Sequence, residues 1–253
     1  FKSVKIRAIR YFLTFCTILL GHYTHAQLLN VDSCINVLKT AKEDTNKVIL
    51  LDEIAWEISY INLQKGIDYS TQSYELAKKL NYERLYPKIC NTQAAIYIDM
   101  AEIAKALDLC LEGLTYAKKN NQLKSQVSLY NSLGNVYGKR KDSKKALYYY
   151  LLSDATLKKY APNKISAAAI GNIVGIYIGF RKLDSAMYYA NLCLDYNLKN
   201  NNIDRLGNNY ISLSEIYYEL NNPQKCLQMA EKSIQSSVNI KDEYTLTHCY
   251  IQL

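Results

Sequence analysis

Apolar residues along the chain recur three, four and seven positions apart, which is the pattern of a helix with one buried face. The whole pattern then returns about every 40 residues, which is the distance from Tyr97 to Tyr137. One column of large residues consists of Tyr97, Tyr137, Tyr177 and Tyr217. A second column, of small residues, consists of Ala106, Ala146, Ala186 and Cys226. Because the two columns fall in separate apolar stripes with a short polar joint between them, each unit is predicted to be a pair of helices and the chain to be all-α.

This period divides most of the chain into repeat units. We expect a capping helix within residues 27–47, five units, and the start of a sixth, truncated unit over 247–253. The five units cover 48–86, 87–126, 127–166, 167–206 and 207–246. Two joints carry helix-start signals: Asp142 suits the N-cap of the second helix of its unit, and Asn222-Pro223 places a cap before a first-turn proline.

The N-terminal segment, residues 1–26, has the pattern of an export signal. A basic stretch precedes an apolar run over 11–20, and Thr24-His25-Ala26 ends the segment with small residues at the cleavage-site positions. The apolar run is about half of the roughly 20 residues that span a bilayer, so a retained membrane anchor is the weaker alternative. We therefore expect residues 1–26 to be a signal peptide and the protein to be exported, with a periplasmic or other extracytoplasmic location.

Net charge changes little once this leader is set aside. The formal charge of the chain is +8, but the leader holds four of the basic residues and none of the acidic ones, which halves the surplus. The remaining cations are spread over predicted helix ends and form no run of five or six. Nucleic acid is therefore not an expected partner.

The residues of the third unit resemble a known repeat. Ser132-Leu133-Gly134-Asn135-Val136-Tyr137, followed by Ala146 and Tyr150, is similar to the tetratricopeptide repeat, in which a large residue, Leu-Gly, Tyr, Ala and an aromatic stand at set distances. The resemblance implies a right-handed superhelical solenoid of antiparallel helix pairs. It also implies a non-catalytic module that binds a protein or peptide on the concave face of the first helices, with self-association as a further possibility.

A narrower resemblance concerns the N-terminal part. The leader, residues 38–47 and the Trp56-containing unit together resemble exported tetratricopeptide sensor regions of Bacteroidetes-type bacteria. Such regions often precede a membrane helix and a histidine kinase or a transcriptional regulator domain. The resemblance implies the extracytoplasmic sensory or scaffolding part of a longer signalling protein. The alternative is a regulatory segment of a histidine kinase whose catalytic domain lies beyond this chain.

Residues for catalysis are scarce. After the leader only His248 remains, so the sequence offers no catalytic triad and no multi-histidine metal site, and we expect no enzyme activity, cofactor or metal in this segment. Gly171, Gly175 and Gly179 stand four apart on one helix face rather than in a phosphate-binding loop, and indicate either a close helix contact or a groove floor without side chains. Four cysteines fall in apolar columns and are interpreted as buried apolar residues rather than disulfide or metal ligands: Cys90, Cys110, Cys193 and Cys226.

The candidate peptide-binding residues lie on first helices. They are Asn91, Asn131, Asn135 and Lys139, together with Tyr218, which stands off the apolar stripe as Tyr148 and Tyr149 do. Amides offer a donor and an acceptor to the backbone of an extended peptide, and Lys139 could meet a carboxylate. The likeness to the family's carboxylate-binding clamp is partial, because the basic residues expected on the next first helix are replaced by Ala168, Gly171 and Asn172.

Overall fold

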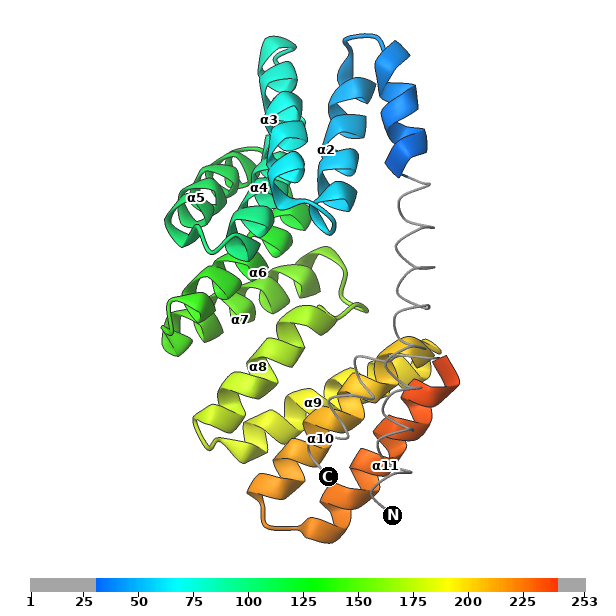
Figure 1. Ribbon diagram of the computed structural model, residues 1–253. Helices are drawn as coiled ribbons and strands as arrows, with labels where there is room; N and C mark the ends of the chain where they lie inside the picture. The colour runs from blue at the N-terminus through cyan, green and yellow to red at the C-terminus, as the bar shows by residue number, and fades with distance from the viewer. Residues whose placement is uncertain (1–30, 241–253) are drawn as a thin grey trace. The chain divides into compact units, whose positions relative to one another are not determined.

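The computed structural model describes residues 31–240, and side chains as far as 237. Every regular element in this range is a helix (Figure 1). The chain divides into two compact units, Phe1–Leu109 and Cys110–Leu253. The predicted signal peptide and the truncated unit over 247–253 lie outside the described residues.

The first compact unit begins, in its described part, with a helix over residues 31–40. There follow α2 (Thr45–Ser59), α3 (Leu63–Lys79), the short 3-10 helix η1 (Glu83–Leu85) and α4 (Tyr86–Asp99). The next helix, α5 (Ile103–Lys119), crosses the division between the two units.

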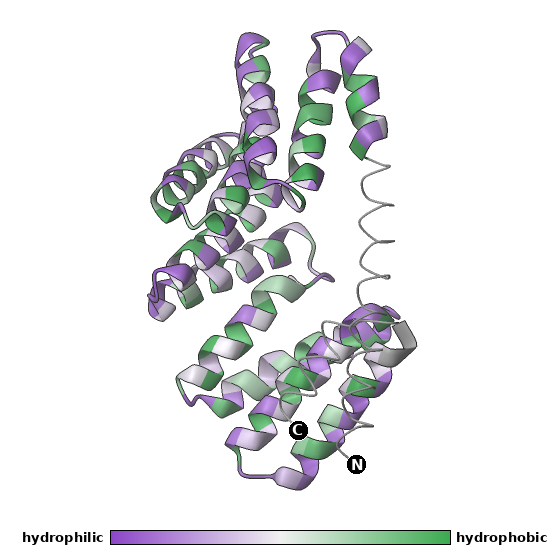
Figure 2. Ribbon diagram, viewed as in Figure 1, coloured by the Kyte–Doolittle hydropathy of each residue, from purple (hydrophilic) through white to green (hydrophobic). Residues whose placement is uncertain are grey.

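The second compact unit holds three consecutive helix pairs. They are α6 (Leu123–Lys139) with α7 (Ser143–Tyr160), α8 (Ala167–Gly179) with α9 (Leu183–Lys199), and α10 (Leu206–Glu219) with α11 (Pro223–Ile240); the 3-10 helix η2 (Ile203–Arg205) precedes α10. Polar and apolar residues are interspersed along the helices, as expected where one face is buried and the other exposed (Figure 2).

Small residues set the spacing within a pair. Gly134 on α6 faces Tyr150 on α7 so closely that a Cβ at Gly134 would overlap the tyrosine ring. Tyr150 is 4% exposed, and its hydroxyl donates a hydrogen bond to Oδ1 of Asn135 at 2.7 Å. Ala146 and Ala186, from the small-residue column, are fully buried. The small-residue column thus lies in the buried interior of the helix pairs.

The joints follow a shorter period than the repeat units. Among the described residues, seven other than glycine have φ between 51° and 61°: Asn81, Ala101, Asn121, Lys141, Arg181, Asn201 and Asn221. In each case the N–H of the next residue donates to the carbonyl five positions earlier, as Asp142 N does to the Tyr137 carbonyl at 2.9 Å. This is the Schellman ending of a helix, and it recurs at half the period of the repeat unit.

Two joints depart from that period. The first is at Ile61, which has no positive φ. Position 161, where another such turn is due, is Ala161 with φ of −146°, and the joint before α8 runs over residues 161–166 and includes Pro162. Helix α6 begins at Leu123, ahead of the unit start predicted at 127. The turn at Asn121 sets this start, and the apolar columns give no sign of that turn.

The two predicted caps are confirmed. Oδ1 of Asp142 accepts a hydrogen bond from the N–H of Lys145 at 3.1 Å, and α7 begins at the next residue, Ser143. Oδ1 of Asn222 accepts from the N–H of Lys225 at 3.1 Å, and α11 begins at Pro223.

The aromatic and cysteine predictions had different outcomes. Tyr149, expected off the stripe, instead stacks on Tyr137 with ring centroids 5.3 Å apart and also on Tyr130, because a tyrosine from the preceding helix covers it. Tyr148 is 58% exposed. No disulfide joins the described cysteines. Cys90, Cys110 and Cys193 are buried, as predicted, whereas Cys226 is only partly buried.

Candidate functional site

The first helices of the three pairs in the second compact unit lie side by side. Nδ2 of Asn172 on α8 donates to Oδ1 of Asn135 on α6 at 3.4 Å. Just beyond the end of α8, Nη1 of Arg181 lies 3.0 Å from Oε2 of Glu219, the last residue of α10. These links order the helices as α6, α8 and α10, and we call the surface between the last two the α8–α10 groove.

The exposed face of α8 carries almost no side chains. A Cβ added at Gly171, Gly175 or Gly179 would meet no atom within 4 Å. The glycines therefore mark no close helix contact, and of the two interpretations offered by the sequence, only an open floor fits. A bare helix face lets another backbone approach closely.

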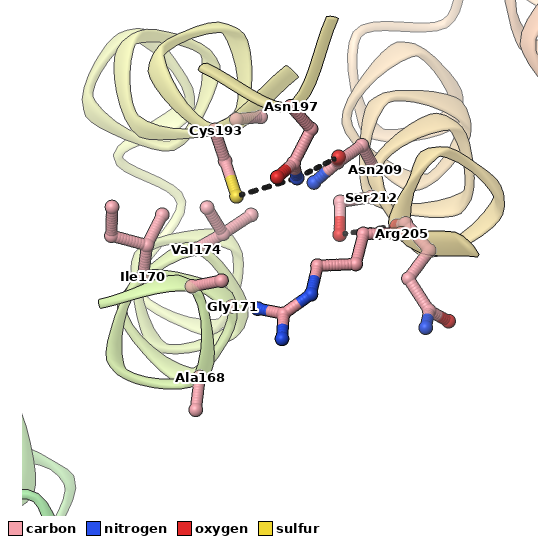
Figure 3. Close-up of a pocket in the computed structure, with 12 residues that line it drawn as sticks. Ala168, Ile170, Gly171, Val174, Cys193, Asn197, Arg205, Asn209 and Ser212 are labelled. Carbon is pink, nitrogen blue, oxygen red and sulfur yellow. Dashed lines mark hydrogen bonds between the residues drawn. The ribbon is translucent and has the colours of Figure 1, made fainter. Parts of the chain in front are cut away.

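Two hollows open at the two ends of the α8–α10 groove. The first hollow, of about 300 Å³, is drawn in Figure 3. Its floor is apolar and its rim is polar; the lining residues are Ala167, Ala168, Ile170, Gly171, Val174, Ala190, Cys193, Asn197, Arg205, Asn208, Asn209 and Ser212. They come from the first half of α8, the second half of α9, η2 and the start of α10.

The second hollow, of about 370 Å³, lies at the other ends of α8 and α10. It is lined by Ile178, Ser214, Glu215, Tyr218, Glu219 and Cys226. Two carboxylates therefore border the second hollow, whereas none of the described residues that line the first is acidic.

A chain of amides fixes the polar side of the first hollow. Asn197 is 1% exposed; its Oδ1 accepts from Nδ2 of Asn202 at 3.0 Å, and its own Nδ2 donates to Oδ1 of Asn209 at 2.7 Å. Because the carbonyl oxygen of Asn209 is engaged, its NH₂ group is turned toward Cys193 and the hollow (Figure 3). The buried amides thus present a donor to the hollow.

The charge in the first hollow belongs to Arg205. Its side chain leaves η2 and reaches across the hollow toward Gly171 (Figure 3). Burial raises the pKa of the Cys193 thiol, against the opposing effects of the neighbouring amides and of Arg205, so this thiol is neutral at ordinary pH and does not cancel the guanidinium charge.

The polar residues predicted on α6 are only partly available. Asn135 is occupied by Tyr150 and Asn172. Oδ1 of Asn131 is buried and has no hydrogen-bond partner among the described residues, whereas Lys139, at the end of α6, is exposed. Oδ1 of Asn135 thus serves the buried Tyr150 hydroxyl, which needs an acceptor, and ligand binding by Asn131, Asn135 and Lys139 stays a prediction.

The other two predicted residues lie in different places. Tyr218 is 72% exposed and lines the second hollow. Asn91 is on α4 in the first compact unit and is half-buried.

The chemistry of the first hollow was not predicted from the sequence. The columns of the first helices hold Ala168, Gly171 and Asn172 where a basic residue was expected. The structure supplies the cation from Arg205, which precedes α10 and stands outside those columns. The available signal was a run of amides with one arginine, Asn200-Asn201-Asn202 and Asn208-Asn209 around Arg205.

Two further findings bear on function. In the part of the chain that the structure describes, no group of three or more His, Cys, Asp or Glu side chains is placed to hold a metal ion. Among the same residues, no helix has the length and apolar character needed to cross a bilayer.

Comparisons with known proteins identify the fold. No protein-family model matches the chain, and no curated protein does. Among solved structures, BtubC (BKLC) from P. vanneervenii is similar with a TM-score of 0.69 at 14% identity, over 86% of this chain and 91% of that one. A Rap protein complexed with competence and sporulation factor is similar with a TM-score of 0.66 at 15% identity, over 93% and 71%.

A third similar structure names the repeat. The TPR-like repeats of a putative kinesin light chain from Podosopora anserina match with a TM-score of 0.61 at 14% identity, over 79% of this chain and 99% of that one. At such identities the likeness concerns the fold alone. The chain has the fold of a tetratricopeptide-like helical repeat protein.

Proposed function

We propose that this chain is a non-catalytic binding module that holds an extended segment of a partner protein in the α8–α10 groove. The observation that carries the proposal is the bare face of α8, which is flanked by a hollow at each end. A helix face without side chains is destabilising in itself, since a glycine in a helix costs about 0.5–1 kcal/mol relative to alanine. Three of them on one exposed face favour a role in close contact with a ligand.

The dimensions suit a short extended segment. The span from Gly171 to Gly179 is about 12 Å at the helical rise. About four residues of extended chain cover that length. The two hollows, one at each end of the groove, then receive side chains of the segment. At the second hollow the exposed Tyr218 ring offers an aromatic surface.

A similar structure supports the same use of the fold. The Rap protein was crystallised in complex with competence and sporulation factor. This is a property of that protein, and it supports a binding role for the present chain because the two share the repeat fold.

The cellular setting is part of the proposal. The leader-like residues 1–26 support export, and the resemblance to exported sensor regions supports a sensory or scaffolding role in a longer signalling protein. Fractionation of cells that produce an epitope-tagged chain tests the location: the tagged protein is expected outside the cytoplasm, and recovery from the cytoplasm alone would refute this part.

The groove is tested with a random dodecapeptide library panned against the immobilised chain, followed by dissociation constants for the enriched peptides. Gly175→Leu adds a side chain to open space in the middle of α8, so the helix is expected to remain folded. This substitution should raise the dissociation constants of the enriched peptides about tenfold or more, the equivalent of about 1.4 kcal/mol of binding free energy.

Asn191→Leu is the matched control. It adds the same side chain to an exposed position of α9 that lines neither hollow, and its dissociation constants should equal those of the unmodified protein. Equal weakening by both substitutions, or no enrichment of any peptide, would overturn the proposed function.

A further inference from the structure

We propose that the first hollow is the specificity subsite of the groove and binds an acidic side chain, aspartate or glutamate, of the bound segment, with Arg205 as its counter-ion. The inference rests on the proposed function and specifies the chemistry of its ligand.

The charge of Arg205 lacks a close partner of its own. Among the described residues its one ion pair is with the adjacent Asp204, at 3.9 Å between Nε and Oδ2, and both side chains are more than half exposed. A pair that long between exposed groups contributes little. The terminal nitrogens of the guanidinium remain able to bind a carboxylate through two parallel hydrogen bonds.

The rest of the hollow fits the same ligand. The apolar floor, which includes Ile170, Val174 and Ala190, suits the methylene groups of an acidic side chain. The Asn209 amide is held by the buried Asn197 and offers a further donor at the polar rim. A volume of about 300 Å³ is at the lower end of ligand pockets. It therefore accommodates a side chain better than a large free ligand.

The contrast between the two hollows places the acidic residue. Two carboxylates border the second hollow, and one of them, Glu219, already pairs with Arg181 at 3.0 Å, whereas the described residues around the first hollow include one cation and no acid. A carboxylate ligand is therefore attracted to the first hollow more strongly than to the second. The acidic residue of the bound segment therefore lies toward the start of α8 and α10.

The open face of α8 itself supplies no cation near the first hollow, where its exposed positions are Ala168, Gly171 and Asn172. The guanidinium of Arg205 comes from η2 instead and reaches across the hollow toward Gly171 (Figure 3). An acidic side chain of the bound segment that enters the hollow meets this guanidinium.

The test uses the full chain and three random octapeptide libraries that differ at one central position and at the end. One library has glutamate at the centre and an amidated end, the second has glutamine and an amidated end, and the third has glutamine and a free carboxylate end. The unmodified protein is expected to bind the glutamate library about tenfold more tightly than the glutamine-amide library. The preference should shrink at high ionic strength.

Arg205→Gln should abolish both the preference and its salt dependence, and Arg205→Lys should restore part of each. Arg140→Gln is the matched control: it removes the same charge from an exposed residue at the end of α6 that lines neither hollow, and it should keep the full preference. Because Arg205 is more than half exposed, Arg205→Gln should leave the melting temperature unchanged.

Each other outcome identifies what has failed. If the protein binds the libraries without a glutamate preference, or keeps that preference in Arg205→Gln, the present inference is overturned and the proposed function stands. An Arg205-dependent preference for the free-carboxylate library would overturn the assignment to a side chain. Failure of the unmodified protein to bind any of the libraries would overturn both proposals.

Discussion

Helices α6 and α8 hold the same position in consecutive repeats and differ in what they present. At equivalent positions of the two repeats, Asn131, Asn135 and Lys139 of α6 are replaced by Gly171, Gly175 and Gly179 of α8. The side chains of α6 partly serve the pair itself, since Asn135 satisfies the Tyr150 hydroxyl. The bare face of α8 leaves open space instead. Helices at the same position of the repeat thus differ in use: α6 supplies an acceptor to its own pair, and α8 keeps its outer face open.

The largest expected effect concerns the glycines of the two helices. Gly134→Ala places a Cβ too close to the ring atoms of Tyr150, which is buried and hydrogen-bonded and therefore cannot move aside freely. We expect a loss of about 1–3 kcal/mol in the free energy of unfolding, the usual cost of overpacking. Gly175→Ala meets no atom and should increase the free energy of unfolding by about 0.5–1 kcal/mol.

Urea denaturation of the two variants measures both effects against the unmodified protein. Opposite signs are the expected result. A stabilising Gly134→Ala would mean that α6 and α7 are not packed through this glycine, and a strongly destabilising Gly175→Ala would mean that the face of α8 is covered.

The difference expected between the amides of the two helices is smaller than that between their glycines. Asn135→Ala leaves the buried Tyr150 hydroxyl without its acceptor at 2.7 Å, which should cost about 1–3 kcal/mol of unfolding free energy. Burial raises the pKa of Tyr150 to about 12, so the hydroxyl stays protonated and in need of that acceptor at neutral pH.

Asn172→Ala serves as the comparison from α8. It removes only a bond of 3.4 Å between Asn172 and Asn135, and Asn172 is exposed, so the free energy of unfolding should change by less than about 0.5 kcal/mol. Thermal and urea unfolding measure the free energy of unfolding of both variants. An equal decrease in the two would contradict the structural role given to Asn135.

The smallest effect concerns the turns that end the two helices. Lys141 and Arg181 follow α6 and α8 with φ of 60° and 54°, a conformation that glycine adopts without strain. Lys141→Gly should raise the free energy of unfolding by about 0.5–1 kcal/mol. Arg181→Gly should gain less, because it also removes the ion pair with Glu219, which is worth about 0–1 kcal/mol at a surface. Chemical denaturation checks the order, and a larger gain for Arg181→Gly would contradict it.

Periodicity was a sound guide to some features and a poor one to others. Local patterns predicted the helix pairs and the burial of three cysteines. They also predicted the caps at Asp142 and Asn222, since a cap needs only a side-chain oxygen next to free amides. The ring stacking of Tyr149 and the hydrogen bond of Asn135 could not be predicted, because the partner residues belong to other helices. The role of Arg205 could not be predicted because Arg205 lies before a helix, outside any repeating column.

The amino-acid sequence by itself determined that this protein is a chain of paired helices with small residues between the partners, because both the helical period and the need to bury apolar faces are written in local spacing. Tertiary structure alone decided whether the glycines of α8 are packed or open, which amide is already bonded, and which cation reaches the first hollow. Those outcomes depend on distances between separate helices, and no spacing along one helix encodes such a distance.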